Sequence, residues 1–120
     1  MLTEAYTVNL FGIDSKYYTN EYMAYIWEES AKAEYYRSGV FITAAIAINR
    51  LVCGEDVRGC NLGETLHRII TTRNPAEVID KDVYYKSFIN VVNDVRTKLG
   101  NPDMTIAVED VDFFYFTKPQ

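Results

Sequence analysis

Residues Asp82–Leu99 read DVYYKSFINVVNDVRTKL, and this stretch has the clearest helical pattern in the chain. Its apolar residues recur at alternating spacings of three and four, which makes one continuous stripe along a helix. Asp80 or Asp82 is suited to cap the N-terminus, and Gly100 is a typical helix stop. We therefore predict a long amphipathic helix over 82–99 whose stripe packs on another layer. The stripe consists of Tyr85, Phe88, Val92, Val95 and Leu99.

The segments that follow this helix predict two short strands, 104–108 and 111–117. The second contains Asp112–Phe116, DFFYF, which places aromatic rings on both faces of an extended chain. A strand that is apolar on both faces has sheet or a partner on either side. We therefore expect the last strand to be covered twice.

The strongest apolar run is Val40–Val52, VFITAAIAINRLV. Its even positions are more β-branched than its odd positions, which predicts a central strand packed heavily on one face and lightly on the other. Its alanines leave a buried helix as the alternative. A glycine-rich loop, Cys53–Gly63, follows, and Leu66–Thr72 returns as a strand, so the two strands can form a wide hairpin. Asn74-Pro75 then predicts a short helical turn.

The N-terminal part begins with a predicted strand, Ala5–Ile13. Glu21–Trp27, EYMAYIW, is ambiguous: three aromatic residues in seven favour a strand, whereas the residues after it favour a helix. We prefer a strand followed by a short helix over about 29–37, which Ser38-Gly39 ends. The alternative is one longer helix that begins near Glu21.

Together these elements predict a single α+β domain over residues 1–120. It consists of a mostly antiparallel sheet of about five or six strands, one long amphipathic helix over 82–99 and one shorter helix over about 29–37.

The composition excludes several classes of protein. Twelve basic against seventeen acidic residues give a net charge of −5, which disfavours direct binding to nucleic acid. No apolar run is long enough to span a membrane, and the first residues carry no secretory signal. We therefore expect a cytoplasmic protein without a membrane or nucleic-acid partner.

Catalytic motifs are not apparent. The glycines do not form a phosphate loop. Cys53, Cys60 and His67 lack the close cysteine pair of most zinc sites, so a metal ion, a disulfide and ordinary thiols stay open, with ordinary thiols favoured. No third group marks Cys60 and His67 as a nucleophile and its base. We therefore predict no catalytic residues, no metal and no cofactor.

A group of arginines suggests ligand binding instead. The guanidinium group matches phosphate oxygens, and the glycine-rich loop next to these arginines has backbone N–H groups that can face an anion. Tyrosine rings can stack on a base. The predicted ligand-binding residues are Arg58, Arg68, Arg73, Asn61, Thr71, Tyr36 and Tyr84.

These features predict a non-enzymatic protein that sequesters a small anionic, nucleotide-like ligand. One small domain offers little concave surface, so we expect a homo-oligomer with sites at subunit boundaries. A short, acidic, tyrosine-rich chain without a catalytic signature is typical of the accessory, counter-defence proteins of phages and mobile elements. The alternative is an inhibitor that occupies the basic nucleic-acid-binding groove of a host protein, as an anti-CRISPR protein does.

Overall fold

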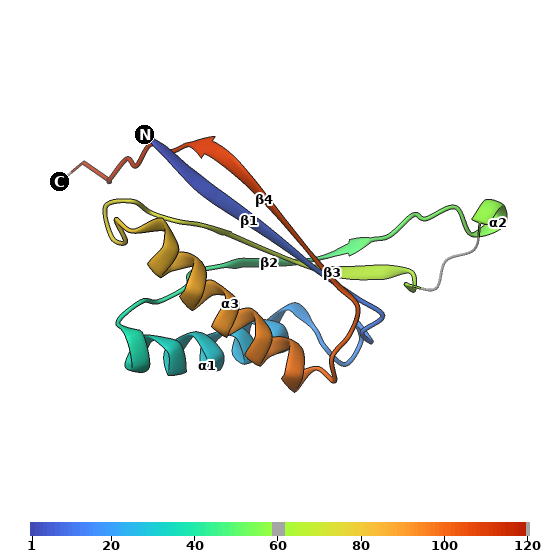
Figure 1. Cartoon of the computed structure of the whole chain (residues 1–120). Helices are drawn as coiled ribbons and strands as arrows, with labels where there is room; N and C mark the ends of the chain where they lie inside the picture. The colour runs from blue at the N-terminus through green and yellow to red at the C-terminus, as the bar shows by residue number, and fades with distance from the viewer. Residues whose placement is uncertain (59–61, 120) are drawn as a thin grey trace.

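The computed structural model of the chain describes residues 1–58 and 62–119. Strands and helices alternate along these residues, and both termini lie at the same end of the sheet (Figure 1). The elements are β1 (Leu2–Phe11), α1 (Asn20–Ser38), β2 (Ala45–Arg50), α2 (Glu55–Arg58), β3 (Thr65–Thr72), α3 (Lys81–Lys98) and β4 (Met104–Asp112). Within these ranges, no helix is long and apolar enough to cross a lipid bilayer.

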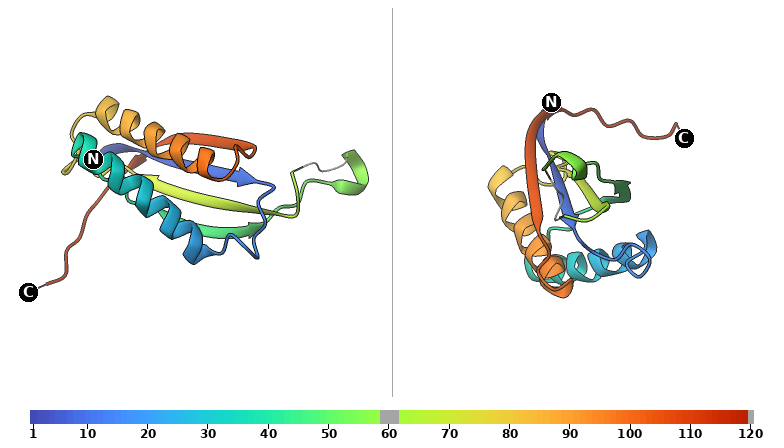
Figure 2. Two further views of the ribbon diagram at one scale, coloured as in Figure 1. Left: turned by 90° about the horizontal axis from the view of Figure 1, so that it is seen from below. Right: turned by 90° about the vertical axis from the view of Figure 1, so that its right-hand side faces the viewer.

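The strands of the described residues form one four-stranded antiparallel sheet in the order β2-β3-β1-β4. Helices α1 and α3 pack side by side on one face of this sheet, as both views in Figure 2 show. The hairpin of β2 and β3, which carries α2, projects beyond the body (Figure 1). The predicted α+β class and antiparallel sheet are confirmed, whereas the prediction of five or six strands is wrong.

Helix α3 begins and ends one residue earlier than predicted. Asp80 caps it, since its carboxylate accepts hydrogen bonds from the backbone N–H groups of Asp82 and Val83 at 2.8 and 3.2 Å. The buried stripe starts at Tyr84 rather than at Tyr85, whose side chain is 47% exposed. The buried face of α3 consists of Tyr84, Ser87, Phe88, Val91, Val92 and Val95.

The prediction of a strand over 21–27 and a short helix over about 29–37 is wrong. A single helix runs from Asn20 to Ser38. Thr19 caps its N-terminus by accepting a hydrogen bond from the N–H of Tyr22, and Gly39 ends it in the left-handed conformation at φ 80°. The strand propensity of the tyrosines was overridden because a helix buries one continuous face on α3 and β2. That face consists of Met23, Ile26, Trp27, Ser30, Ala31 and Glu34.

The apolar run 40–52 forms a shorter strand than predicted, and β2 lies at the edge of the sheet rather than at its centre. The interior strands are β3 and β1, and the pairing of β3 with β2 confirms the predicted hairpin. The alternation was correct: Ile42, Ala44 and Ile46 are more buried than the odd positions between them. The approach to β2, residues 40–44, is extended but has no assigned sheet pairing.

The C-terminal region contains one strand instead of two. β4 pairs with β1 from Met104 to Asp112, across the gap between the two predicted strands. The aromatic segment beyond it is extended and has no strand partner within the described chain. The predicted double cover of this segment is therefore not present in a single copy.

The two helices are joined by a buried carboxylate, that of Glu34, whose side chain is 5% exposed. Arg37 donates to it at 2.5 and 3.1 Å, Ser87 of α3 at 2.9 Å and Asn90 of α3 at 3.2 Å. Burial favours the uncharged acid, but the hydrogen bonds outweigh it and hold the pKa of Glu34 below its ordinary value of 4.5.

We expect the free energy of unfolding to decrease as the pH falls below 4.5 and to stop depending on Glu34 once the pH passes its lower folded-state pKa. The direction follows because the unfolded chain takes up the proton first. The variant E34Q removes this titration and should flatten that part of the profile. Urea unfolding between about pH 7 and about pH 3 measures both proteins. Parallel profiles for the two proteins would contradict the assignment.

Candidate functional site

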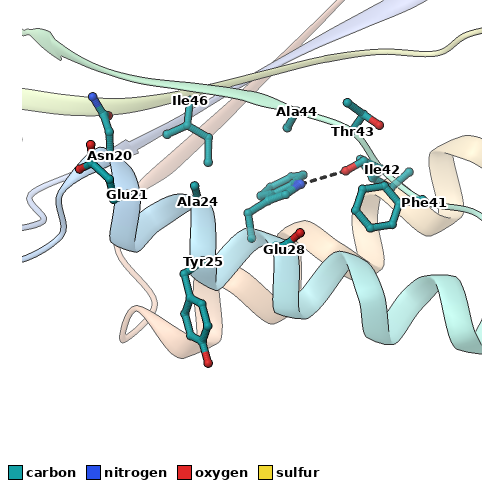
Figure 3. Close-up of a pocket in the computed structure, with 11 residues that line it drawn as sticks. Asn20, Glu21, Ala24, Tyr25, Glu28, Phe41, Ile42, Thr43, Ala44 and Ile46 are labelled. Atoms are coloured by element: carbon teal, nitrogen blue, oxygen red, sulfur yellow. Dashed lines mark hydrogen bonds between the residues drawn. The ribbon is translucent and has the colours of Figure 1, made fainter.

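A groove of about 690 Å³ lies between α1 and the edge strand β2 (Figure 3). Its volume lies within the range of small-molecule sites, roughly 300–1,000 Å³. We call it the α1/β2 groove. It is lined by Asn20, Glu21, Ala24, Tyr25, Trp27, Glu28, Phe41, Ile42, Thr43, Ala44 and Ile46.

Trp27 forms the floor of this groove and fixes its width. The indole is 4% exposed, and its Nε1 donates a hydrogen bond to the carbonyl oxygen of Ile42 at 3.0 Å. This bond joins α1 to the extended approach of β2, where no sheet pairing is assigned. The apolar floor continues along Ile42 and Ile46, and Phe41 contributes a ring that is 40% exposed.

The rim of the α1/β2 groove is acidic. Glu21 and Glu28 are seven residues apart, so they lie on the same side of α1, about 10 Å apart along its axis. No lysine or arginine is among the residues that line this groove in the described structure. Figure 3 shows the ring of Tyr25 pointing away from β2. The aromatic lining of the groove is therefore the ring of Phe41 and the indole floor of Trp27. Carboxylates beside aromatic rings suit an organic cation.

Three of the predicted ligand-binding residues, Thr71, Arg73 and Tyr84, belong to a buried cluster and do not line the α1/β2 groove. Arg73 donates to both oxygens of Glu4, at 2.7 and 3.0 Å, and to the carbonyl oxygens of Val78 and Ile79, at 3.0 and 3.1 Å. The hydrogen bonds from Arg73 to Glu4 lower the pKa of the Glu4 carboxyl from its ordinary value. The side chains of Thr71 and Tyr84 are buried, and their hydroxyl oxygens lie 2.5 Å apart in a hydrogen bond.

The structure places Arg68 and Tyr36 apart from this cluster and on different elements. Arg68 lies on the sheet face opposite the helices, where it donates to Asn9 at 3.4 Å. Tyr36 is 81% exposed on α1. Arg58 ends α2, and Asn61 lies outside the described residues. Ligand binding by these residues stays a prediction.

The cysteine–histidine group is described only in part. Cys60 lies outside the described residues, and Cys53 is not a free thiol, contrary to the ordinary thiol that we favoured. His67 is fully buried on β3, with its Nε2 2.7 Å from the carbonyl oxygen of Tyr18.

A smaller hollow of about 270 Å³ adjoins the α1/β2 groove, since Phe41 and Thr43 line both. Tyr84 lies on one side of it, and Phe113 and Tyr115 of the C-terminal segment lie on another. The C-terminal segment therefore passes the Phe41 end of the α1/β2 groove at Phe113 and Tyr115.

Sequence reasoning missed the residues of the α1/β2 groove because it assigned 21–27 to a strand. A strand would place Glu21 and Trp27 on one face and Glu28 on the other. The available signal was the spacing of Met23, Ile26, Trp27 and Ser30, which is helical and continues to Glu34.

Comparison with known proteins identifies the relatives of this chain. The profile of the family described as SAM lyase matches residues 1–117. A solved phage SAM lyase in complex with S-methyl-5'-thioadenosine is similar in structure, with a TM-score of 0.60 and 16% identity over 89% of this chain and 80% of that one. No curated protein matches.

Two further solved structures are more distant. A putative PII-like signalling protein from Thermus thermophilus has a TM-score of 0.43 and 13% identity, over 92% of this chain and 88% of that one. CPII from Thiomonas intermedia K12, bound to ADP, AMP and acetate, has a TM-score of 0.46 and 14% identity, over 95% and 90%.

The family match overturns one prediction. A lyase is an enzyme, so the prediction that this chain has no catalytic activity is wrong. The comparisons give no support to the alternative of a host protein target.

Proposed function

Because the chain belongs to the SAM lyase family, we propose that it cleaves S-adenosylmethionine in the α1/β2 groove. The observation that carries this proposal is the acidic rim over an aromatic floor. S-Adenosylmethionine has a sulfonium and an ammonium group, and both seek negative charge or aromatic faces. Glu21 and Glu28 supply the charge. Phe41 offers a partly exposed face on which the adenine can stack.

The chemistry of the substrate explains how a groove without an apparent protein nucleophile or general base can catalyse the proposed cleavage. S-Methyl-5'-thioadenosine, with which the structural neighbour is in complex, is the fragment left when the bond between sulfur and Cγ of the methionine part is cleaved. We propose that the substrate's own carboxylate oxygen attacks Cγ and closes a five-membered lactone. The bonding pair of the S–Cγ bond stays on sulfur, which becomes a neutral thioether. No proton moves and no water is consumed.

In this reaction the protein binds and orients. The step neutralises a carboxylate and a sulfonium, so an environment with little water favours it. Ile42 and Trp27 provide such an environment because their side chains are 0% and 4% exposed. Holding the carboxylate near Cγ converts binding energy into rate. The acidic rim contributes mainly to affinity, since the ammonium group that it attracts keeps its charge in the transition state.

The proposed reaction replaces the predicted sequestration of a ligand with its cleavage. The predicted role as a counter-defence protein of a phage or mobile element is kept. A phage or mobile-element protein that cleaves S-adenosylmethionine deprives the methyltransferases of its host of their methyl donor. Sequestration would remove one molecule of S-adenosylmethionine per binding site, whereas an enzyme removes many molecules at each site. We place this activity in the host cytoplasm, where the substrate is found.

Incubation of the purified protein with S-adenosylmethionine tests the proposal. We expect S-methyl-5'-thioadenosine and homoserine lactone in equal amounts, quantified by liquid chromatography and mass spectrometry. In ¹⁸O-labelled water, lactone that is quenched early should contain no label. S-Adenosylhomocysteine, which lacks the sulfonium charge, is the matched control and should remain intact. Recovery of intact S-adenosylmethionine bound to the protein would instead establish sequestration.

A further inference from the structure

Four tyrosines gather at the start of α1, and their rings contact one another. The rings of Tyr18 and Tyr22 are parallel, with centroids 5.5 Å apart. Tyr25 stacks on the other ring of the helix, Tyr22, at 6.5 Å, and Tyr17 meets Tyr18 and Tyr22 edge-on. Figure 3 shows that the ring of Tyr25 points away from β2. We call Tyr17, Tyr18, Tyr22 and Tyr25 the tyrosine cluster.

Three rings of the tyrosine cluster line a hollow of about 250 Å³ between the start of α1 and the end of α3. This volume lies below the range of drug-sized sites, roughly 300–1,000 Å³, so the hollow suits a ligand of a few heavy atoms. Its aromatic walls share one side of α1 because their spacing is helical. The lining residues are Tyr18, Tyr22, Tyr25, Ile26, Glu29 and Lys98.

The charge of this hollow is negative. Lys98 is held by its neighbours, since its Nζ donates to Oγ of Ser30 at 2.9 Å and lies 3.1 Å from a carboxylate oxygen of Asp94. Glu29 is exposed, and none of the ion pairs of the described residues includes it. Asp94 therefore offsets the charge of Lys98, whereas the carboxylate of Glu29 is left for a ligand.

The backbone that carries the Tyr18 ring is fixed from two sides. The N–H of Tyr18 donates to the carbonyl oxygen of Asp14 at 2.8 Å. The carbonyl oxygen of Tyr18 lies 2.7 Å from Nε2 of His67, which is fully buried on β3. Thr19 caps the helix directly after it. A ligand therefore meets rings that are already in place, and little conformational entropy is lost when it binds.

We propose that the tyrosine cluster is a second binding site, which takes a small quaternary ammonium cation between its rings and the carboxylate of Glu29. The faces of tyrosine rings attract a cation within about 6 Å of the ring centroid, and quaternary ammonium groups are the ligands that aromatic cages select. Their methyl groups also pack on apolar surface, which Ile26 supplies. This site needs no reaction, so it goes beyond the proposed function. It lies next to the α1/β2 groove: Glu28 lines the groove, Glu29 lines the cluster, and Tyr25 lines both.

Titration of the wild-type protein with choline tests the proposal. We expect saturable shifts of the tyrosine ring resonances in ¹H–¹³C NMR, with a dissociation constant of about 1–10 mM. The matched control ligand is 3,3-dimethyl-1-butanol, which has the shape of choline without its charge and should bind at least about 10-fold more weakly. The absence of saturable shifts, or equal binding of the two compounds, would overturn the proposal.

Two pairs of variants locate the bound cation. E29Q should raise the dissociation constant for choline about fivefold, and Y22L, which keeps apolar bulk without the aromatic face, about tenfold. The controls are E28Q, the adjacent carboxylate in the α1/β2 groove, and Y36L, an 81% exposed ring on the same helix outside the hollow. Both should stay within about twofold of the wild-type value at about 0.15 M salt.

The choline titration separates this site from the proposed function. If E28Q weakens choline binding and E29Q does not, the cation lies in the α1/β2 groove and the second site is wrong. Because Glu29 is exposed, E29Q gives this answer even if Y22L fails to fold. Binding of choline is measured without substrate, so a protein that cleaves no S-adenosylmethionine would refute the proposed function and leave this test intact.

Discussion

Removing both rim charges with E21Q/E28Q should lower kcat/KM for S-adenosylmethionine about 50-fold. Each carboxylate is exposed in the free protein and contributes about 1 kcal/mol or somewhat more once a cation covers it. Two such contributions amount to about 2–3 kcal/mol, where 1.4 kcal/mol is tenfold. The loss should fall on KM rather than on kcat, because the substrate's ammonium group keeps its charge and is attracted equally in the bound substrate and in the transition state.

Steady-state kinetics at low ionic strength measures this effect, and a double variant elsewhere controls for net charge. E109Q/D110N makes the same change on exposed residues of β4. At about 0.15 M salt, which screens the long-range attraction of the net charge for the substrate, this variant should keep kcat/KM within about twofold of the wild-type value. Equal losses in both double variants would show that overall charge, and not the α1/β2 groove, attracts the substrate.

The parts of the fold that the sequence predicts are those in which local pattern and tertiary packing agree. The spacing of Phe88, Val92 and Val95 has a single helical solution, and β1 and β3 combine β-branched residues with clear ends. Over Glu21–Trp27 the two levels disagree. The tyrosines favour a strand locally, but the helix places Met23 and Trp27 against the core, and burial outweighs propensity.

The site was harder to predict because the proposed reaction needs little from the protein. Searches for paired acids, nucleophiles and phosphate loops assume that side chains attack or donate protons. Where the substrate contains both the nucleophile and a charged leaving group, an apolar floor and two rim carboxylates are sufficient. Such a site has no sequence signature, and its residues come from two segments whose proximity depends on the fold. The absence of a catalytic motif therefore did not exclude catalysis.

The largest loss of stability is expected from R73M, which should lower the free energy of unfolding by about 3–5 kcal/mol. The substitution removes the counter-charge of Glu4, whose side chain is only 8% exposed, and the donors to two backbone carbonyls. Urea unfolding at about pH 7 measures the loss. The double variant E4M/R73M is the matched control and should recover most of it, because no buried charge is left without its partner.

The same two variants separate a structural role of Arg73 from the role in ligand binding that its sequence context suggested. A guanidinium that donates to Glu4, Val78 and Ile79 has four of its five N–H groups engaged within the protein. We therefore expect E4M/R73M, once folded, to keep the wild-type KM for S-adenosylmethionine. If R73M has the wild-type free energy of unfolding but binds substrate poorly, then Arg73 contacts the ligand. The substrate would in that case bind at the buried cluster rather than in the α1/β2 groove.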